Sequence, residues 1–363
     1  MNKKRFFDNR LRYLSFIQNT DEKSKISEEI YPFIKKLPKN KTFIKILDAG
    51  TGDGTIKSNL IKSFHKYHPN TSLIITGKEI SYEDLKNTLH KMSDRFIEHP
   101  NLMVTMTNVK FSEISQIGSS EKIKNKKVKA FNLILKNNNS FDFNDQITGL
   151  ESFVKKYWGI TIDKDGKTSY SHPCLIRIYR ADYKRYLEPF IEKEDETFNY
   201  DLIIASQAYR AASNVETKVN SVIKPLIKLL NRPGKLFITH SCGNDSVEKI
   251  LRVAWKNKNP FPNKAKDLIE FLKKDNLDTD YKYGFSKPKA YHFRYKKVPD
   301  ETISELFGHG VDSKWENVLY AGQIPEKDIN ELNNKPSLVK KVKNAIMKDE
   351  IFFKNELFII NKT

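Results

Sequence analysis

Cysteine is scarce in this 363-residue sequence, which contains only Cys174 and Cys242. Neither lies in a spacing that holds zinc, so the sequence predicts no metal site and no disulfide framework, as fits a reducing cytoplasm. Long apolar runs are also missing. No stretch approaches the roughly 20 residues of a membrane helix, and no apolar segment follows the basic start at residues 1–5 to suggest a signal peptide. We therefore expect a cytoplasmic protein without a membrane span.

Acidic residues are too few to balance the basic ones, since 45 Asp and Glu face 64 Lys and Arg and leave a formal charge of +19. Such a field attracts polyanions and makes a nucleic-acid partner possible. Most lysines are scattered, however, and the densest run, over residues 122–129, lies between turn-like residues. The sequence favours a lysine-coated surface over a nucleic-acid groove, and it indicates no oligomeric state.

The order of predicted elements indicates an α/β fold. Helices are expected over 3–38, with a break near 19–22. Strands and helices then alternate up to residue 106 and again from residue 200. The predicted strands are 43–48, 73–76, 102–106, 200–205, 235–239 and 352–360, and the predicted helices are 55–67, 82–96, 215–230 and 267–274. This order predicts a Rossmann-like, doubly wound and mostly parallel seven-stranded sheet.

The same alternation of strands and helices divides the chain into four parts. Residues 1–40 form an N-terminal helical segment that is expected to cover part of the binding site, and 41–111 form the first half of the core. Residues 112–199 break the rhythm and are expected to be an insertion with a hairpin and a helix, including a turn at 163–166. Residues 200–363 form the second half of the core with the C-terminal strands.

The most informative motif begins at Asp48, which ends the first predicted strand and precedes Gly50, Gly52 and Gly54. Glycines allow a tight turn and a close approach of the backbone to a ligand. A dinucleotide site would need its third glycine one residue later. An acid so near would repel a pyrophosphate, whereas it suits the ammonium of a methionyl group.

Three further features support a nucleoside ligand. Glu79 lies at the end of the second strand, where a carboxylate can accept hydrogen bonds from ribose hydroxyls. Residues 105–108 end the third strand, where a base would lie. The segment 232–238 supplies a turn and a strand after the fourth helix. An ordinary strand-end turn is the alternative for each feature alone.

At this point the sequence resembles the class I S-adenosylmethionine-dependent methyltransferases, and more narrowly the histamine N-methyltransferase family. The narrower resemblance is carried by short segments spread over the chain. They are Arg12-Tyr13 with Ser15-Phe16-Ile17, Thr20-Asp21-Glu22, Tyr200-Asp201-Leu202-Ile203 with Ser206-Gln207, Asn259-Pro260-Phe261-Pro262 with Asp267-Leu268, and residues 351–358.

The resemblance implies S-adenosyl-L-methionine as cofactor and a small amine-type acceptor. Glu22 and Gln207 are expected to act in catalysis by orienting the amine while its lone pair stays free. The cofactor-binding residues are then Asp48, Gly50, Gly52, Gly54, Glu79, Asp84, Asn108, Ser112 and Ser206. The acceptor-binding residues are Tyr13, Glu22, Gln207, Tyr209 and Asn355.

Two departures from that family stand out. This chain spends nearly ninety residues between its third and fourth strands, where the family has few. The family's aromatic acceptor wall is not clearly reproduced after Ser241, since its tryptophans align with Val247 and Leu251 or, after a short insertion, with Trp255. Two other functions stay open: a methyltransferase for RNA or protein that uses the basic surface, and a non-catalytic cofactor-binding protein.

Overall fold

The computed structural model describes residues 10–117, 121–162, 168–191, 199–275, 277, 281–296, 310–348 and 350–363. Ten strands of this part form one mixed sheet in the order β12-β14-β11-β10-β1-β2-β3-β9-β6, with β13 also paired to β14. The predicted doubly wound fold is confirmed, but the predicted number of seven strands is wrong. The strands are β1 (Phe43–Ala49), β2 (Ser72–Lys78), β3 (Leu102–Thr107), β6 (Lys129–Leu135), β9 (Cys174–Arg180), β10 (Tyr200–Ser206), β11 (Leu230–Ser241), β12 (Tyr283–Phe285), β13 (Lys289–Arg294) and β14 (Phe352–Lys362).

The sheet reverses its order at β1. Strands β3, β2, β1, β10 and β11 are parallel, and β1 lies between β2 and β10. The chain therefore builds the sheet outward from β1 in one direction and then in the other. In such sheets ligands bind at the carboxyl ends of the strands, beside the point of reversal.

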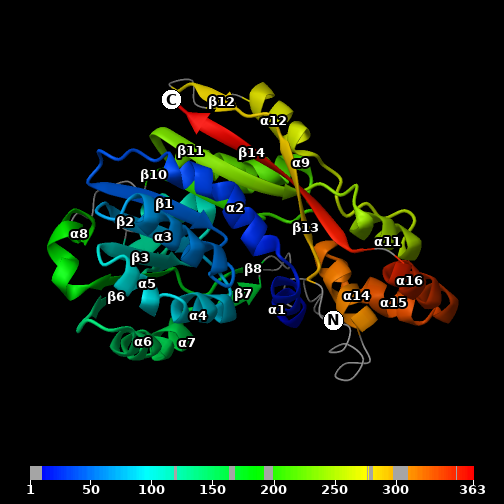
Figure 1. Ribbon diagram of the computed structural model, residues 1–363, viewed down its shortest axis with the longest axis horizontal. Helices are drawn as coiled ribbons and strands as arrows, with labels where there is room; N and C mark the ends of the chain where they lie inside the picture. The colour runs from blue at the N-terminus through cyan, green and yellow to red at the C-terminus, as the bar shows by residue number, and fades with distance from the viewer. Residues whose placement is uncertain are drawn as a thin grey trace.

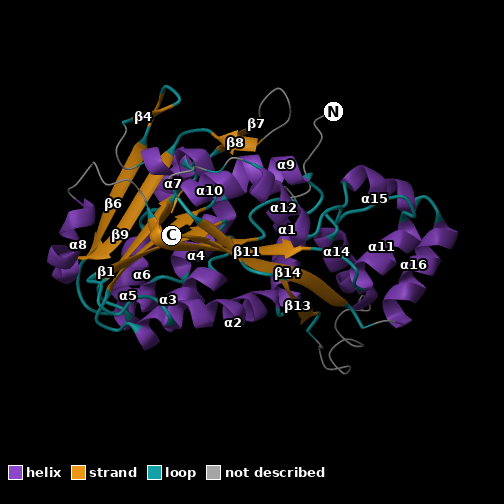
Figure 2. Ribbon diagram, turned by 90° about the horizontal axis from the view of Figure 1, so that it is seen from above, coloured by secondary structure: helices purple, strands orange, loops and turns teal. Residues whose placement is uncertain are grey.

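Helices cover both faces of the sheet (Figure 2). In β1, Ile46 packs into the core on one side and Leu47 into the core on the other. The first core includes side chains from α2 (Glu22–Lys35), α3 (Thr55–Tyr67) and α5 (Ser93–Glu98). The second includes η4 (Val219–Ile223), α10 (Lys224–Lys228) and α12 (Ala265–Lys274). Strands buried on both faces explain the continuous apolar runs in the sequence.

Most of the predicted core elements lie close to their predicted bounds. The N-terminal helical region consists of α1 (Arg10–Asn19) and α2, divided at the predicted break, while residues 3–9 lie outside the described part. The prediction of one helix over 82–96 is wrong. The chain forms α4 (Tyr82–His90) and α5, because Lys91 N–H bonds to Thr88 O and Met92 N–H to Leu89 O, three residues back, which ends the first helix.

The insertion contributes two strands to the sheet, which the sequence did not predict. Strand β9 pairs antiparallel with β3, and β6 extends the sheet beyond it. A β7–β8 hairpin is present, while the predicted turn at 163–166 lies outside the described residues. The other elements of the insertion are η2 (Phe111–Gln116), β4 (Lys122–Ile123), β5 (Lys126–Lys127), α6 (Ser140–Thr148), α7 (Glu151–Tyr157), β7 (Ile160–Ile162), β8 (Thr168–Tyr170), η3 (Ala181–Tyr183) and α8 (Lys184–Ile191).

A second helical group lies at the opposite end of the sheet from the insertion (Figure 1). It consists of α14 (Gly310–Ala321), α15 (Glu326–Asn333) and α16 (Pro336–Lys348) and packs against α1 and α11 (Ser246–Ala254). The sequence patterns did not predict this group. The other helix of the described part that has not yet been named is α9 (Val215–Lys218).

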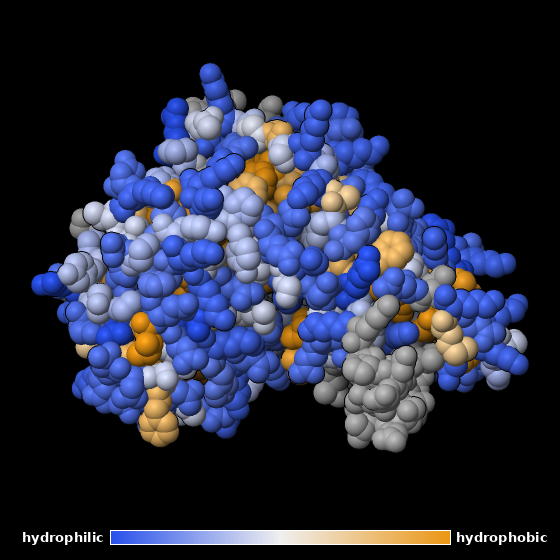
Figure 3. Space-filling view, viewed as in Figure 1, coloured by the Kyte–Doolittle hydropathy of each residue, from blue (hydrophilic) through white to orange (hydrophobic). Residues whose placement is uncertain are grey.

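The surface is predominantly hydrophilic on the face shown in Figure 3, where apolar residues form small separate groups. Six of the eight large apolar residues that are exposed in the described part of the chain lie in the insertion. They are Phe131, Ile134, Phe141, Ile160, Ile162 and Tyr186. No helix of the described part is both long and apolar enough to cross a bilayer.

Arg180 fastens the insertion to the core, and its loss is expected to destabilise the protein. The side chain is buried and donates hydrogen bonds to Phe96 O (3.2 Å), Asn138 Oδ1 (3.3 Å) and Asp182 Oδ1 (2.9 Å). We expect Arg180→Met to lower the free energy of unfolding by about 3 kcal/mol, because the buried Phe96 carbonyl loses a charged donor. Urea denaturation measures this change.

Arg185→Met is the matched control. Arg185 is exposed and bonds only its neighbour Tyr186 among the described side chains. Its substitution should change stability by no more than about 0.5 kcal/mol. Equal effects of the two variants would show that the contacts of Arg180 do not hold the insertion in place.

Candidate functional site

The loop between β1 and α3 is shaped by its three glycines. Gly50, Gly52 and Gly54 have φ angles of 98°, 58° and 80°. L-residues with a Cβ rarely adopt this left-handed region. A Cβ at Gly52 would overlap the Tyr13 hydroxyl, and one at Gly54 would lie 2.7 Å from Thr88 Cα. The glycines therefore serve both the turn and the close packing of α1 and α4 on the loop.

Glu79 links the end of β2 to this loop. Its Oε2 accepts a hydrogen bond from Gly52 N–H at 2.8 Å, and its Oε1 accepts from Ile80 N–H and Ser81 N–H, also at 2.8 Å. The carboxylate is 8% exposed. The predicted carboxylate thus lies at its predicted strand end, and it also fixes the glycine loop.

Tyr13 covers the loop from the other side. Its hydroxyl accepts a hydrogen bond from Asp53 N–H at 3.2 Å. Burial, together with the negative charges of Asp84, Asp53 and Glu79, raises the pKa of Tyr13 well above its usual value, so the phenol is neutral. The structure places Tyr13, which the sequence assigned to the acceptor, against the glycine loop.

A hollow of about 530 Å³ opens beside this loop. It lies between the N-terminal helices and the start of α3, and its lining includes Lys23, Asp53, Thr55 and Lys91. Lys91 pairs with Asp53 at 3.2 Å. Burial alone would lower the pKa of Lys23, but the nearby charges of Glu22 and Asp53 outweigh burial and raise it.

The other predicted cofactor residues occupy different settings. Asp48 is buried beneath the loop, and Ser206 ends β10. Asp84 lies in the first turn of α4, where its N–H bonds to Ser81 Oγ at 3.3 Å. Asn108 joins β3 to the insertion, because its amide donates to His172 O (2.9 Å) and accepts from Cys174 N–H (2.8 Å). Ser112 is exposed in η2.

Two of the predicted acceptor residues, Glu22 and Asn355, are brought together around Tyr291. Asn355 Nδ2 donates to Tyr291 Oη at 3.1 Å, and the two residues are opposite each other in the β13–β14 pair. Burial raises the pKa of Tyr291, and the negative charge of Glu22 adds to the rise. Thr239 also bonds Tyr291 and lies 3.5 Å from Ser206 Oγ, oxygen to oxygen. These buried side chains form a polar cluster at the carboxyl ends of β10 and β11.

Gln207 and Tyr209 follow β10 directly. Gln207 has a φ of 52°, and its Nε2 has no hydrogen-bond partner in the described part of the chain. Tyr209 is buried against the ring of His240, with Lys218 Nζ 5.5 Å from its ring centre. Burial and the charge of Lys218 lower the pKa of His240 to about 4, so this imidazole is neutral at pH 7.

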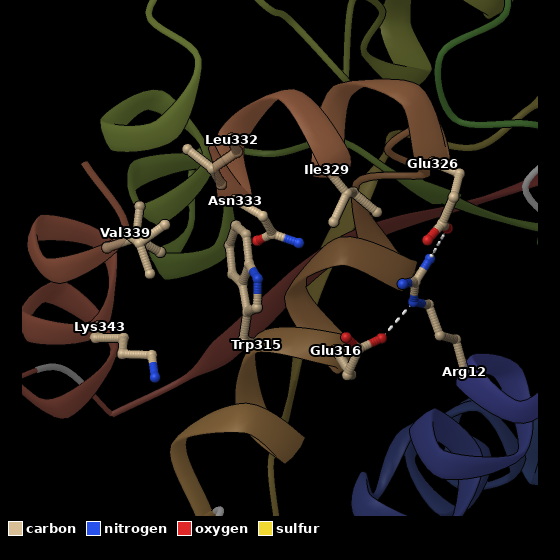
Figure 4. Close-up of a pocket in the computed structure, with 10 residues that line it drawn as sticks. Arg12, Trp315, Glu316, Glu326, Ile329, Leu332, Asn333, Val339 and Lys343 are labelled. Carbon is tan, nitrogen blue, oxygen red and sulfur yellow. Dashed lines mark hydrogen bonds and ion pairs between the residues drawn. The ribbon is translucent and has the colours of Figure 1, made fainter. Parts of the chain in front are cut away.

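The three residues that align with the family's aromatic wall lie on α11 (Ser246–Ala254) or directly after it. Val247 and Leu251 are buried on α11 within the apolar core. Trp255 stacks on Trp315 of α14 with ring centres 5.9 Å apart. Trp315 in turn lines a pocket of about 300 Å³ in the second helical group (Figure 4).

Arg12 connects that pocket to the glycine loop. It forms ion pairs with Glu316 of α14 and with Glu326 of α15, the latter at 2.7 Å, and it stands beside Tyr13 in the chain. Figure 4 shows its guanidinium between the two carboxylates. Burial opposes the charge of Arg12, and the two glutamates outweigh it and raise the pKa. The helical group therefore holds α1 in place over the loop.

Sequence reasoning missed Tyr291 and Arg12 as parts of this site. A pattern for Tyr291 existed, because Tyr291 and Phe293 are the buried residues of an alternating strand in β13. The partners of Arg12 lie more than 300 residues away along the chain, so no local pattern reveals them.

Comparison with protein families and with curated protein sequences gives no match. Several solved structures show a weak similarity in fold. Loganic acid methyltransferase with SAH has a TM-score of 0.37 and 11% identity, over 94% of this chain and 91% of that one. Precorrin-6y C5,15-methyltransferase from Geobacter metallireducens has a TM-score of 0.31 and 9% identity, over 92% of this chain and 88% of that one. The small RNA methyltransferase HEN1 has a TM-score of 0.30 and 12% identity, over 72% of this chain and 23% of that one.

Proposed function

We propose that this protein is an S-adenosylmethionine-dependent methyltransferase that methylates a nitrogen of a small amine-type molecule. The observation that supports this most is the glycine loop at the reversal point of the sheet. It combines three left-handed glycines, the buried acid Asp48 beneath them and the Glu79 carboxylate 2.8 Å from Gly52 N.

The residues of the loop suit an adenosyl and methionyl ligand. Glu79 keeps acceptor capacity beyond its three backbone hydrogen bonds, since a carboxylate has about four lone-pair positions. Asp48 Oδ2 is buried and has no partner in the described part of the chain, as fits a cationic group nearby. The bound cofactor would supply an activated methyl group on sulfur. Gly50, Gly52, Gly54, Asp84, Asn108, Ser112 and Ser206 complete the proposed cofactor set.

On the acceptor side, Glu22, Gln207 and Asn355 orient the amine. A carboxylate and two amides can accept and donate hydrogen bonds without taking the nitrogen lone pair, and positioning supplies most of the acceleration in such a reaction. Tyr13 and Tyr209 would line the acceptor space. Helix α1 covers the loop and excludes water there.

Glu79→Ala tests the cofactor site. We expect calorimetric titration to show that the variant binds S-adenosylhomocysteine at least about tenfold more weakly than wild type, or 1.4 kcal/mol. The loss has two causes: the carboxylate is removed from the ligand, and Gly52 N–H loses its acceptor. Glu83→Ala is the control, because Glu83 is exposed and lies only four residues away. Folded wild type that binds no S-adenosylhomocysteine would rule out the proposed cofactor.

The acceptor is tested by a mass-spectrometric screen of amines, peptides and RNA with labelled cofactor. Methylated amines support the proposal. Methylated RNA or protein would favour the alternative suggested by the charge of +19. Cofactor binding with transfer to none of the three classes would favour a non-catalytic cofactor-binding protein.

A further inference from the structure

Lys57 is a cation buried directly beneath the glycine loop. It lies on α3, is 0% exposed, and its Nζ has no hydrogen-bond partner in the part of the chain that the structure describes. Its ammonium occupies the place where a Cβ on Gly77 would stand, next to Thr51 Oγ1 and Met106 Sδ. An ammonium without partners in such a place is costly unless a negative charge lies near it.

Asp48 supplies that charge, because it is opposite Gly77 in the β1–β2 pair and Lys57 Nζ lies against Gly77. It is 1% exposed, and its Oδ2 also has no partner among the described residues. Burial raises the pKa of Asp48, while the charge of Lys57 and a hydrogen bond from Thr51 oppose that rise. Burial lowers the pKa of Lys57 to about 8, while Asp48 acts in the opposite direction. The two charges therefore favour each other's ionised form without a direct ion pair.

We infer that Lys57 is a positioning residue of the proposed cofactor site, which keeps Asp48 ionised so that its free oxygen can receive the α-ammonium of the cofactor's amino-acid part. This inference rests on the proposed function. Lys57 touches no ligand in this scheme. It acts through Asp48, from the side of the loop opposite to the bound molecule.

Two other charged residues also influence the ionisation of Asp48. Lys23, from α2, favours the ionised carboxylate, and Glu79, after β2, disfavours it. Lys23 already pairs with Glu22 at 3.2 Å, whereas Lys57 has no ion pair with any residue that the structure describes. Lys57 is therefore the cation whose removal should raise the pKa of Asp48 most.

The test compares two ligands that differ only in the amino-acid part. S-adenosylhomocysteine carries the α-ammonium, and 5′-methylthioadenosine lacks it. We expect Lys57→Met to weaken binding of S-adenosylhomocysteine roughly tenfold at pH 7, because a neutral Asp48 no longer makes a charge-assisted hydrogen bond with the α-ammonium, and to leave binding of 5′-methylthioadenosine unchanged. Because Asp48 must be ionised, its higher pKa in the variant moves the loss of S-adenosylhomocysteine binding to higher pH than in wild type.

A double-mutant cycle separates this role from a structural one. In the Asp48→Asn background, Lys57→Met should have no further effect on S-adenosylhomocysteine affinity. The double variant also removes both buried charges and so avoids leaving one unpaired. If Lys57→Met does not fold, Lys57→Gln replaces it as a neutral polar variant.

The inference would be overturned if Lys57→Met weakened binding of both ligands equally, or if it weakened binding of S-adenosylhomocysteine as much in the Asp48→Asn background as in wild type. Either result would leave the proposed function intact. Failure of wild type to bind S-adenosylhomocysteine would instead contradict the proposed function itself. The two results are told apart by the wild-type titration alone.

Discussion

Gly54→Ala is expected to reduce S-adenosylhomocysteine affinity by on the order of a hundredfold, since displacements near 1 Å in a site have effects of that size. Gly54 has a φ of 80°, and a Cβ there would lie 2.7 Å from Thr88 Cα. Backbone cannot move aside as a flexible side chain can, so α4 must shift away from the loop. Calorimetric titration measures the affinity.

The same substitution should also destabilise the fold. A left-handed conformation disfavours alanine by about 1–2 kcal/mol, and overpacking adds about 1–3 kcal/mol. Gly284→Ala is the control, because the nearest atoms to its added Cβ are at an ordinary 3.8 Å. A Gly54→Ala variant with wild-type affinity and stability would show that the loop is adaptable, which conflicts with a site built on its fixed shape.

Glu22→Gln is expected to lower kcat/KM for the methyl acceptor by about a hundredfold while S-adenosylhomocysteine affinity stays within about twofold of wild type, since a lost charge-assisted hydrogen bond costs about 1.5–3 kcal/mol. Glu22 is 5% exposed and lies beside Tyr291 and Asn355. The substitution keeps the shape of the side chain and removes its charge. Steady-state kinetics with the acceptor found in the screen give the measurement.

Glu28→Gln is the matched control on the same helix. Glu28 is exposed and pairs with Lys25 at 2.9 Å, so its loss should leave transfer unchanged. A reduction of cofactor affinity equal to the loss of kcat/KM in Glu22→Gln would assign Glu22 to the cofactor rather than to the acceptor.

The first half of the sheet could be predicted from sequence because its strands are buried on both faces. Residues such as Ile46 and Leu47 then form continuous apolar runs between turns, and Gly50, Gly52 and Gly54 mark the loop. Strand-end positions follow from the fold alone, so Asp48 and Glu79 could be placed with it.

The remaining parts depend on contacts between distant segments. Arg177 and Arg180 in β9 interrupt its apolar run, and the strand reaches the sheet only by pairing with β3. Tyr291 becomes part of the site because β14 brings Asn355 opposite it. Such a pairing partner over sixty residues away has no local pattern. Sequence reasoning therefore found the ends of the polar cluster and missed the residue between them.

Strand β14 lies between β11 on one side and β12 and β13 on the other, yet it follows all of them along the chain. After β11 is synthesised, about 110 further residues must be added before β14 can pair with its edge. This takes roughly 6–20 s at common elongation rates. Throughout that interval the nascent chain has its glycine loop but lacks Asn355. The edge of β11 that β14 covers in the complete fold is exposed, and an exposed apolar strand edge promotes aggregation. Chaperone demand should thus peak late in translation, after the proposed cofactor loop has formed.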